Sequence, residues 1–490
     1  MKKWVSEVVT QDEIKKWSNG DIITISAGTG AGKSRFIKVS LYAHAKRQGK
    51  KILFLIHRTN CVNQFQMEIE KDYKTDIIDI KTYQHIEAKI RYDKNFDFSE
   101  YQYIVCDEFH YFMQDYFNKY TDISLNAILN QTDKIRIFMS ATGDVMEKYL
   151  SGFKKIDVTP YKISIDYNFI RKLIFFNKDE TFEQVIQQAI DENKKAIFFI
   201  DSAEKAYNLY KKYKEHCLFN CSKHNDKYYK YVDEEKINQM LLKERFEENI
   251  LITTTCLDTG VNIIDKDLYC IFCDVKDIRT LIQCIGRKRI QDKDDKIELY
   301  IKSVNNKQLG GMITELNKRM DMARYLKDHS AHEYIEKYPR DYDKYCIVYA
   351  DKADKEKDTV NLNINYLIYI KYVMDCATYQ QMVKEEFGYC KFMARMFGFY
   401  DPYQGYDYVL FDEEYKNNNL MEYLDSIIGH KLLKENQKEL IEKIDLKVNG
   451  RQQRSYKKLN EGLEMIKLPF VILPKKSGNV RYWIVEKIAN

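Results

Sequence analysis

Short apolar runs alternate with longer segments of helical period through the first third of the chain. The runs rich in Ile, Leu, Phe and Val are at residues 21–27, 51–57, 103–109 and 135–142. Between them, residues 34–49 and 63–73 space their apolar positions as a helix does. This alternation is typical of a parallel β-sheet covered by helices. We therefore expect an α/β domain over residues 1–160.

A second block repeats the pattern less regularly. Its apolar runs are at residues 194–201, 248–255, 267–274 and 295–303, and residues 203–216 have helical period. A second α/β domain is expected over residues 161–305, where the polar stretch that follows residue 302 ends it.

The rest of the sequence predicts a helical region and a small terminal module. Residues 306–440 are rich in tyrosine and charge and are mostly helical in period, without a recognisable catalytic motif. The elements expected near the end are two helices and the two strands of a hairpin, at residues 434–444, 451–466, 470–474 and 480–485. Two helices followed by a hairpin indicate a winged-helix-like module, which we place at residues 441–490.

Positive charge is concentrated in this last module. The whole chain carries 79 Lys+Arg against 74 Asp+Glu, a net charge of +5 that by itself indicates no nucleic-acid partner. Residues 443–490 hold 11 Lys+Arg against 4 Asp+Glu, or +7, so the rest of the chain is slightly acidic. Arg451, Arg454, Lys457 and Lys458 lie on or near the second predicted helix, where they could meet phosphate. The alternative is a packing domain with a solvated basic face.

Cysteine usage and hydropathy indicate a reducing compartment. The cysteine count of 11 is odd, and several cysteines fall in predicted buried strands, so we expect no disulfides. The set His216, Cys217, Cys221 and His224 has a spacing that zinc could use, but its strand-to-loop context favours packing. The first residues lack the apolar core of a signal peptide, and no run of about 18 apolar residues could span a bilayer. We expect a cytoplasmic protein with no membrane contact.

The segment AGTGAGKS, between a predicted strand and a predicted helix, indicates a phosphate-binding loop. Small residues let the backbone amides wrap a phosphate, and the following helix adds favourable partial charge. Lys33 is expected to contact the outer phosphates, and Ser34 to hold Mg²⁺ through its hydroxyl. The nucleotide-binding residues are therefore Ala27, Gly28, Thr29, Gly30, Ala31, Gly32, Lys33 and Ser34.

An acidic pair ends the third apolar run. Asp107 and Glu108 follow a buried strand, so their carboxylates emerge at the carboxyl edge of the sheet, beside the phosphate-binding loop. There Asp107 is expected to bind Mg²⁺ through water, and Glu108 to orient and deprotonate the attacking water.

The ordered set of motifs resembles that of superfamily-two helicases of the DExH type, in which two RecA-like domains clamp ATP. The resemblance covers roughly residues 15–300 and matches four segments, residues 27–34, 107–110, 140–142 and 283–289. It implies two tandem RecA-like domains, ATP with Mg²⁺, and nucleic acid running across both domains. Weaker matches place nucleic-acid contacts at Arg58, Thr59, Thr82, Ser202 and Thr254. Gly260 and Asn262 are expected near the cleft between the domains.

The last motif, QCIGRKR, departs from the family pattern. Cys284 and Ile290 occupy positions where the family has arginines, while Arg287 remains and Arg289 is one position early. The resemblance implies that Arg287 stabilises charge on the γ-phosphate, with Arg289 as its helper and Gln283 bridging to His110 or the attacking water. The alternative is a basic helix start on the protein surface.

These motifs together predict an ATP hydrolase that moves along nucleic acid or unwinds it. DNA is the favoured partner over RNA, and a nuclease or replication protein is a further expected partner. One alternative is a duplex translocase or remodeller that does not separate strands. Another is a nucleotide-switched module that binds nucleic acid through its terminal module and never moves.

Overall fold

The computed structural model divides into two compact units. One unit is Met1–Leu173 with Glu183–Asp407, and the other is Ile174–Phe182 with Tyr408–Asn490. The residues that the structure describes are 4–28, 30–57, 59–92, 96–109, 111–114, 120–257, 261–340, 345–350, 361–448, 451–478 and 480–488.

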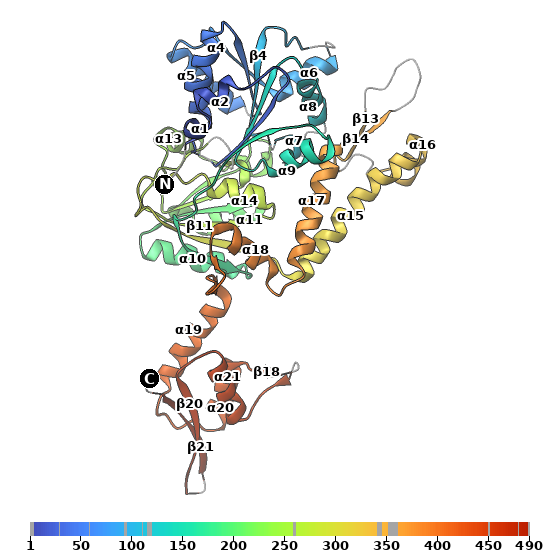
Figure 1. The fold of residues 1–490 in the computed structure, drawn as a ribbon. Coiled ribbons are helices and arrows are strands. Elements are labelled where there is room, and N and C mark those ends of the chain that lie inside the picture. Colours follow the sequence, from blue (N-terminus) through green and yellow to red (C-terminus); the bar gives the residue numbers. More distant parts are fainter. Residues whose placement is uncertain are drawn as a thin grey trace. The chain divides into compact units, whose positions relative to one another are not determined.

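A parallel sheet forms the centre of the first α/β domain (Figure 1). From edge to edge its strands are β3 (Ile78–Thr82), β2 (Lys51–Ile56), β4 (Tyr101–Asp107), β5 (Ile135–Ser140), β1 (Ile22–Ala27) and β6 (Thr159–Ile163). Because every neighbouring pair is parallel, the loops after β1, β4 and β5 leave from the same edge of the sheet. The motifs predicted after these three strands therefore meet at one edge.

Alternating side chains on these strands build two cores, one on each face. Ile52 and Phe54 of β2 belong to one cluster and Leu53 and Leu55 to the other, as the two-residue period of a strand requires. On the first face lie α1 (Val5–Val8), α2 (Gln11–Lys15), α3 (Lys33–Arg35), the π-helical segment Phe36–Leu41, α4 (Tyr42–Arg47) and α5 (Thr59–Lys71). On the second lie α6 (Tyr83–Tyr92), α7 (Tyr111–Gln114), α8 (Thr121–Leu129), α9 (Asp144–Lys148) and the π-helical segment Tyr149–Phe153.

The second α/β domain has its own sheet, in the order β17-β7-β12-β11-β8-β10-β9, in which β17 (Val409–Leu410) is a short strand paired with the end of β7. Its strands are β7 (Ile170–Phe176), β12 (Ile297–Lys302), β11 (Leu268–Asp274), β8 (Lys195–Ile200), β10 (Ile250–Thr253) and β9 (Cys217–Asn220). The helices of this block are α10 (Glu180–Asp191), α11 (Ala203–Lys212), α12 (Asp226–Tyr229), α13 (Glu234–Lys243) and α14 (Ile278–Ile285), with 3₁₀ turns at Lys214–His216 and Thr255–Leu257. Both α/β domains confirm the predicted fold class.

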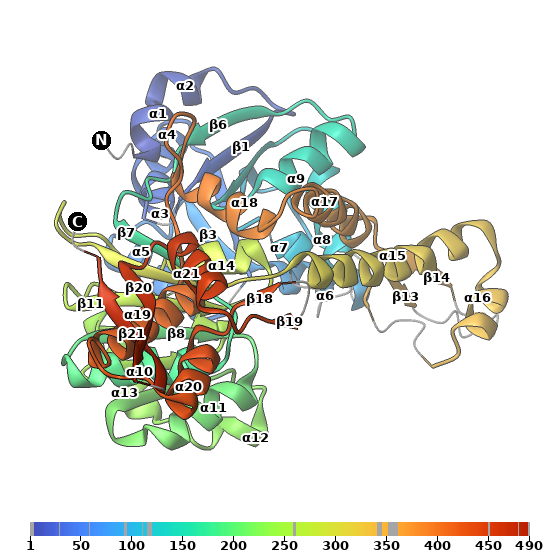
Figure 2. The ribbon, with the colours of Figure 1, turned by 90° about the horizontal axis from the view of Figure 1, so that it is seen from below.

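Long helices follow, as predicted for residues 306–440. They are α15 (Asn306–Asp328), α16 (Ala331–Lys337), α17 (Tyr366–Met382) and α18 (Gly388–Phe397), with small hairpins of β13 (Val348–Ala350) and β14 (Leu362–Ile364) and of β15 (Tyr400–Asp401) and β16 (Gly405–Tyr406). Helices α15 and α17 run side by side in both views (Figures 1 and 2). No helix in the described part of the chain combines the length and the apolar character that a bilayer crossing requires.

The C-terminal unit contains both predicted helices and the predicted hairpin. Its elements are β17 (Val409–Leu410), α19 (Phe411–Ser426), α20 (Lys434–Ile444), β18 (Lys447–Val448), β19 (Arg451–Gln452), α21 (Tyr456–Met465), β20 (Phe470–Ser477) and β21 (Val480–Lys487). The second helix begins later than predicted, because residues 451–452 pair with β18 and Ser455 caps the helix. The hairpin strands are longer than predicted on both sides of the turn. A winged-helix arrangement stays a prediction.

The cysteine and histidine set considered for zinc does not converge in space. Cys217 and Cys221 are buried, whereas His216 and His224 are exposed. Within the described residues, no group of three or more His, Cys, Asp or Glu side chains could hold a metal ion.

Candidate active site

The predicted phosphate-binding loop leaves the carboxyl end of β1 and leads into α3. Gly30 and Gly32 have φ angles of 75° and 83°, a region that glycine enters with little steric cost. A Cβ on Gly32 would lie 2.8 Å from Cε3 of Trp4, and one on Gly28 would lie 2.9 Å from Cγ1 of Ile165. The loop therefore requires its glycines for both conformation and space. Thr29, at its centre, lies outside the described residues.

Lys33 lies between the phosphate-binding loop and the acidic pair. Its Nζ donates to the carbonyl of Ala27 at 3.0 Å and is 3.9 Å from Oε1 of Glu108. Only 8% of the lysine side chain is exposed. Ser34, the next residue, is exposed at the start of the same helix. The structure thus brings together the predicted phosphate-binding cation and the predicted catalytic carboxylate.

Asp107 carries a buried oxygen that the protein does not satisfy. It ends β4, and its Oδ1 is buried without a hydrogen-bond partner in the described part of the chain. Burial and the neighbouring charge of Glu108 raise the pKa of Asp107 to about 7, against the lowering effect of Lys33. An unsatisfied carboxylate oxygen at a sheet edge is the donor that Mg²⁺ prefers, so the residues fit this ion.

The backbone around the acidic pair is held by several contacts. Glu108 has a φ of 49°, so the chain turns sharply directly after β4. The hydroxyl of Tyr83 donates to the carbonyl of Asp107 at 2.8 Å, and the amide of Phe109 donates to Met139 on β5 at 3.0 Å. These bonds fix the direction in which both carboxylates leave the sheet. His110 lies outside the described residues.

The segment after β5 connects the acidic pair to the second domain. The hydroxyl of Ser140 donates to Oε2 of Glu108 at 3.5 Å and accepts the amide of Thr142 at 3.0 Å. On the other side, Nε2 of Gln283 donates to Oγ1 of Thr142 at 3.4 Å. Gln283 is on α14 of the second domain and is 2% exposed. A short chain of polar contacts therefore runs from Glu108 to the last motif.

The two arginines of the last motif have different surroundings. Arg287 donates through Nε to the carbonyl of Gln283 at 3.0 Å and through Nη1 to that of Val261 at 3.2 Å. Arg289 donates through Nε to Oδ1 of Asn262 at 2.7 Å, but its buried Nη1 has no hydrogen-bond partner in the described part of the chain. Burial and the charge of Arg287 lower the pKa of Arg289 to about 10, against the raising effects of Glu244 and Glu108.

Two of the charged side chains of the last motif are buried. Arg287 and Lys288 are each 4% exposed, and Lys288 forms an ion pair with Asp295 at 2.5 Å. The alternative of a basic helix start on the surface is therefore wrong. The side-chain Nδ2 of Asn262 donates to Oε1 of Glu244 at 2.8 Å, so this residue connects Arg289 to a carboxylate of its own domain.

The residues predicted to contact nucleic acid lie where strands end. Thr82 ends β3 and its hydroxyl accepts the amide of His85 at 3.0 Å, while Ser202 follows β8 and caps α11. Thr254 follows β10 and is 8% exposed. These side chains share the sheet edges at which the motifs gather. Arg58 and Gly260 lie outside the described residues, as does the side chain of Thr59.

In the C-terminal unit, the predicted phosphate contacts are at the surface. Arg454, Lys457 and Lys458 are exposed, the last two in the first turn of α21. Arg451 lies on β19, and its side chain is outside the described residues.

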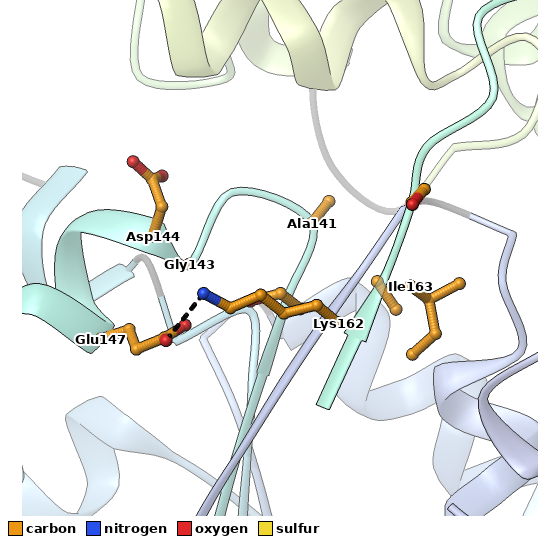
Figure 3. A pocket seen from close by; sticks show the side chains of 9 residues that line it. Ala141, Gly143, Asp144, Glu147, Lys162 and Ile163 are labelled. Carbon is orange, nitrogen blue, oxygen red and sulfur yellow. Dashed lines mark ion pairs between the residues drawn. The ribbon is translucent and has the colours of Figure 1, made fainter. Parts of the chain in front are cut away.

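A cavity of about 190 Å³ borders the phosphate-binding loop (Figure 3). It lies among the carboxyl ends of β1 and β6 and the start of α9, and Nζ of Lys162 is 2.9 Å from Oε1 of Glu147 at its wall. Asp144 also lines it. The sequence pattern did not indicate these residues, because the polar, proline-containing segment 159–163 gave no signal of the strand β6 that carries Lys162.

Two families match consecutive regions of the chain. Residues 2–144 match the type III restriction enzyme, res subunit, and residues 177–290 match the helicase conserved C-terminal domain. No curated protein matches the chain.

Several solved helicase structures are similar at low sequence identity. Saccharomyces cerevisiae Dbp5 bound to RNA and ADP BeF3 is 16% identical, with 58% of this chain and 79% of that chain covered and a TM-score of 0.42. The DEAD-box helicase Mss116 bound to ssRNA and UDP-BeF is 14% identical, with 63% and 71% covered and a TM-score of 0.46. The Escherichia coli DEAH/RHA helicase HrpB is 12% identical, with 61% and 42% covered and a TM-score of 0.42.

The fold and the site define a nucleotide-binding enzyme built from two α/β domains. The two family matches, one on each α/β domain, support a superfamily-two helicase with two RecA-like domains. Its activity is ATP hydrolysis that depends on nucleic acid. The DExH subtype stays a prediction.

Proposed function

We propose that the chain hydrolyses ATP at the seam between its two RecA-like domains and uses the cycle to move along nucleic acid or to separate its strands. The observation that carries this proposal is the contact of Gln283, from the second domain, with Thr142 beside Glu108 of the first. Groups from both domains thus meet beside the phosphate-binding loop. Closure and reopening around ATP would move the nucleic-acid contacts of the two domains relative to each other.

In this proposal the first domain binds ATP and activates water. Lys33 contacts the outer phosphates, and the amides of residues 27–34 surround them. Glu108 accepts the proton of the attacking water, with Ser140 holding its second oxygen. Asp107 and Ser34 are the proposed ligands of Mg²⁺, which would supply charge neutralisation on the phosphates. The unsatisfied Oδ1 of Asp107 supports this assignment.

The second domain contributes an arginine to the same nucleotide. We assign the contact with the γ-phosphate to Arg289 and a bracing role to Arg287, which reverses the order implied by the family resemblance. Support comes from the buried Nη1 of Arg289, which has no hydrogen-bond partner in the described chain, and from the effect of Glu108 on its pKa. Arg287 already donates to two backbone carbonyls. An arginine that meets charge only as ATP is cleaved accelerates the chemical step.

DNA is the proposed nucleic acid. A direct comparison of DNA with RNA tests this choice. The match of the first domain to a restriction-enzyme subunit supports DNA, and also supports the alternative of a duplex translocase that serves a nuclease. A replication protein is a second proposed partner. The location we propose is the cytoplasm, and the free thiols of buried cysteines such as Cys106 and Cys270 support a reducing compartment.

The basic residues at the start of α21 and just before it are the proposed extra contact with phosphate. Replacing Arg451, Arg454, Lys457 and Lys458 together by Ala should weaken nucleic-acid affinity and lower the slope of log Kd against log salt by about 2 to 4, because each lost phosphate contact removes roughly 0.7 to 0.9 from that slope. A matched control replaces Lys211, Lys214, Lys227 and Lys230 of the second domain. Unchanged binding at several salt concentrations would assign the basic residues of the C-terminal unit to solvation.

The test of the function compares ATP turnover with single-stranded DNA, duplex DNA and RNA, followed by an unwinding assay on a labelled forked duplex. Stimulated turnover with strand release supports a helicase. Stimulated turnover on duplex DNA without strand release supports the translocase alternative. Turnover that ignores every nucleic acid would favour the nucleotide-switched binding module and contradict the proposal.

A further inference from the structure

A buried cluster of four charges connects helix α17 to the start of α14. Arg279 of α14 donates through Nη1 to Oδ1 of Asp375 at 2.8 Å. Lys371 lies 2.6 Å from Oδ2 of Asp375 and 3.4 Å from Oδ2 of Asp277. The side chains of Lys371, Asp375 and Arg279 are between 10% and 16% exposed. Two cations and two carboxylates therefore balance one another, three of them largely buried and the fourth, Asp277, 34% exposed.

Asp277 connects this cluster to the helix that leads into the last motif. It is the N-cap of α14, and its Oδ1 accepts the amide of Thr280 at 2.9 Å. The same helix carries Gln283 and leads directly into Arg287 and Arg289. A helix of eight residues is short and stiff, so a change in how its first turn is held shifts its last turn as well.

A neighbouring face of α17 belongs to the first domain. Leu367 is fully buried in the core cluster that also contains Tyr83, Phe112 and Leu125, and Ile370 and Met374 pack against that cluster. Helix α17 begins beside α7, which follows the acidic pair (Figure 1). Three residues of one helix face thus anchor α17 in the domain that holds ATP.

A third face of α17 packs on α15. Ile368, Tyr372 and Cys376 share a cluster with Met320 and Ala323 of that helix. This packing gives α17 a rigid support that does not involve either nucleotide motif. Helix α17 is therefore a stiff element with one side fixed in the first domain and one charged side on the arginine-bearing helix of the second.

We propose that α17 is a coupling element of the motor, in which Lys371 and Asp375 position α14 so that its arginines reach the nucleotide held by the first domain. This inference rests on the proposed function and assigns a role to a region outside both family matches. Lys371 and Asp375 are positioning residues, since they touch Asp277 and Arg279 rather than the reacting groups.

The cluster also reaches the segment after β5. The charge of Asp144, which begins α9 and lines the cavity beside the phosphate-binding loop, acts on Arg279 together with Asp375 and Asp277. Carboxylates of α9, α14 and α17 thus all interact electrostatically with Arg279. A shift of α17 would move α14 through the charged cluster. The hydrogen bond between Gln283 of α14 and Thr142 would then change as well.

Lys371→Met should lower the kcat of nucleic-acid-stimulated ATP hydrolysis by about tenfold or more and change KM by less than about threefold. The arginines act mainly on the transition state, whereas Lys33 and the loop bind ATP in the ground state. Lys371→Arg keeps the charge and should restore kcat to within about threefold of the wild type. A helix that only stabilised the fold would not give this separation of kcat from KM.

Arg319→Met is the matched control, because Arg319 is a half-buried cation of α15 that contacts Glu315, Tyr345 and Tyr372 but not α14. The full chain is used throughout, and binding of a fluorescent ATP analogue confirms that each variant is folded. If Lys371→Met does not fold, Asp375→Asn replaces it with the same expected loss. Unchanged kcat in the folded variant, or an equal loss in Arg319→Met, would overturn the coupling role.

Failure of the proposed function gives a different result. In that case the wild-type chain itself would show no stimulation of ATP hydrolysis by nucleic acid, and the coupling role would be rejected together with the proposed function. A stimulated wild type with an unaffected Lys371→Met variant rejects the coupling role alone.

Discussion

Two clusters of buried charge lie at opposite ends of α14, and they differ in whether their charges are matched. In the cluster of Asp277, Arg279, Lys371 and Asp375, each cation has a carboxylate within 3.4 Å, although Nε of Arg279 is itself buried without a hydrogen-bond partner in the described chain. In the nucleotide site, Oδ1 of Asp107 and Nη1 of Arg289 are buried without hydrogen-bond partners in the described chain.

The pKa directions express this difference. Burial would raise the pKa of Asp277, but Lys371, Arg279 and Thr280 outweigh it and lower the pKa to about 2. Burial raises the pKa of Asp107 to about 7 because its carboxylate neighbour adds to the effect and Lys33 offsets only part of it. A matched cluster stabilises one arrangement of helices, whereas an unmatched one is prepared for a charged ligand. Buried charge therefore marks the coupling element and the ATP site in opposite ways.

The largest expected effect is a loss of ATP turnover, and it distinguishes Glu108 from Glu147. Glu108→Gln should lower ATP turnover by about 10²- to 10⁴-fold, because an amide cannot accept the proton of the attacking water. Nucleotide binding should persist, since Lys33 is unchanged. The matched control is Glu147→Gln, whose carboxylate is paired with Lys162 beside the cavity and should leave turnover within about threefold. Loss of nucleotide binding in Glu108→Gln, measured by fluorescent titration, would make the role of Glu108 structural.

A second comparison tests the two arginines against each other. Arg289→Ala should lower kcat by about 10²-fold and change the melting temperature little, because its Nη1 serves the nucleotide rather than the fold. Arg287→Ala should lower the melting temperature by several degrees, about 2–4 °C per kcal/mol, because two buried backbone carbonyls lose their donor. Steady-state kinetics and thermal melts measure both quantities. The reverse pattern would restore Arg287 as the residue at the γ-phosphate.

Replacing Asp107 by Asn should give a more stable but less active protein. The folded state holds a proton on Asp107 up to a pH of about 7, whereas the unfolded chain releases it near 3.8, so stability without nucleotide falls as pH rises through this window. At pH 8 the amide removes that cost, and the melting temperature without nucleotide should rise by about 2–4 °C. ATP turnover should require about tenfold more Mg²⁺, because a neutral amide is a weaker ligand. A less stable variant at pH 8 would show that the unmatched charge is not costly.

The smallest effect has the opposite sign. Asp277→Asn keeps a good N-cap but removes a charge whose folded pKa of about 2 lies below the ordinary value of 3.8. Its contribution is present above pH 4 and is lost as pH falls from about 4 to 2. Because 34% of the side chain is exposed, solvent screening limits the loss to about 1 kcal/mol at pH 7. Denaturant titrations at pH 7 and pH 3 measure it, and an equal difference at both values would contradict the account.

The prediction of the nucleotide site rests on local patterns in the sequence. The glycines that precede Lys33 need positive φ, and Asp107 follows an unmistakable buried strand. Both signals lie within a few residues of the chemistry. The edge strands β3 and β6 were missed, since the polar residues of 78–82 and the proline of 159–163 hide their strand character.

The charged cluster could not be predicted because its partners are distant in sequence. Periodicity identifies 366–382 as helical but does not reveal that Lys371 meets Asp277, 94 residues earlier. The C-terminal unit shows the same limit. It includes Ile174–Phe182, where the amide of Asn177 donates to Asp412 at 2.7 Å and Thr181 donates to the same carboxylate at 3.2 Å. Pairings of this kind depend on the complete fold rather than on local sequence.

The most direct test of the central claim is a structure of the chain with Mg²⁺, a non-hydrolysable ATP analogue and an oligonucleotide. The account predicts Lys33, Asp107 and Glu108 of the first domain around the phosphates and Mg²⁺, with the guanidinium of Arg289 from the second domain within hydrogen-bonding distance, about 3 Å, of the γ-phosphate. A closed complex in which neither Arg289 nor Arg287 reaches the nucleotide would contradict it.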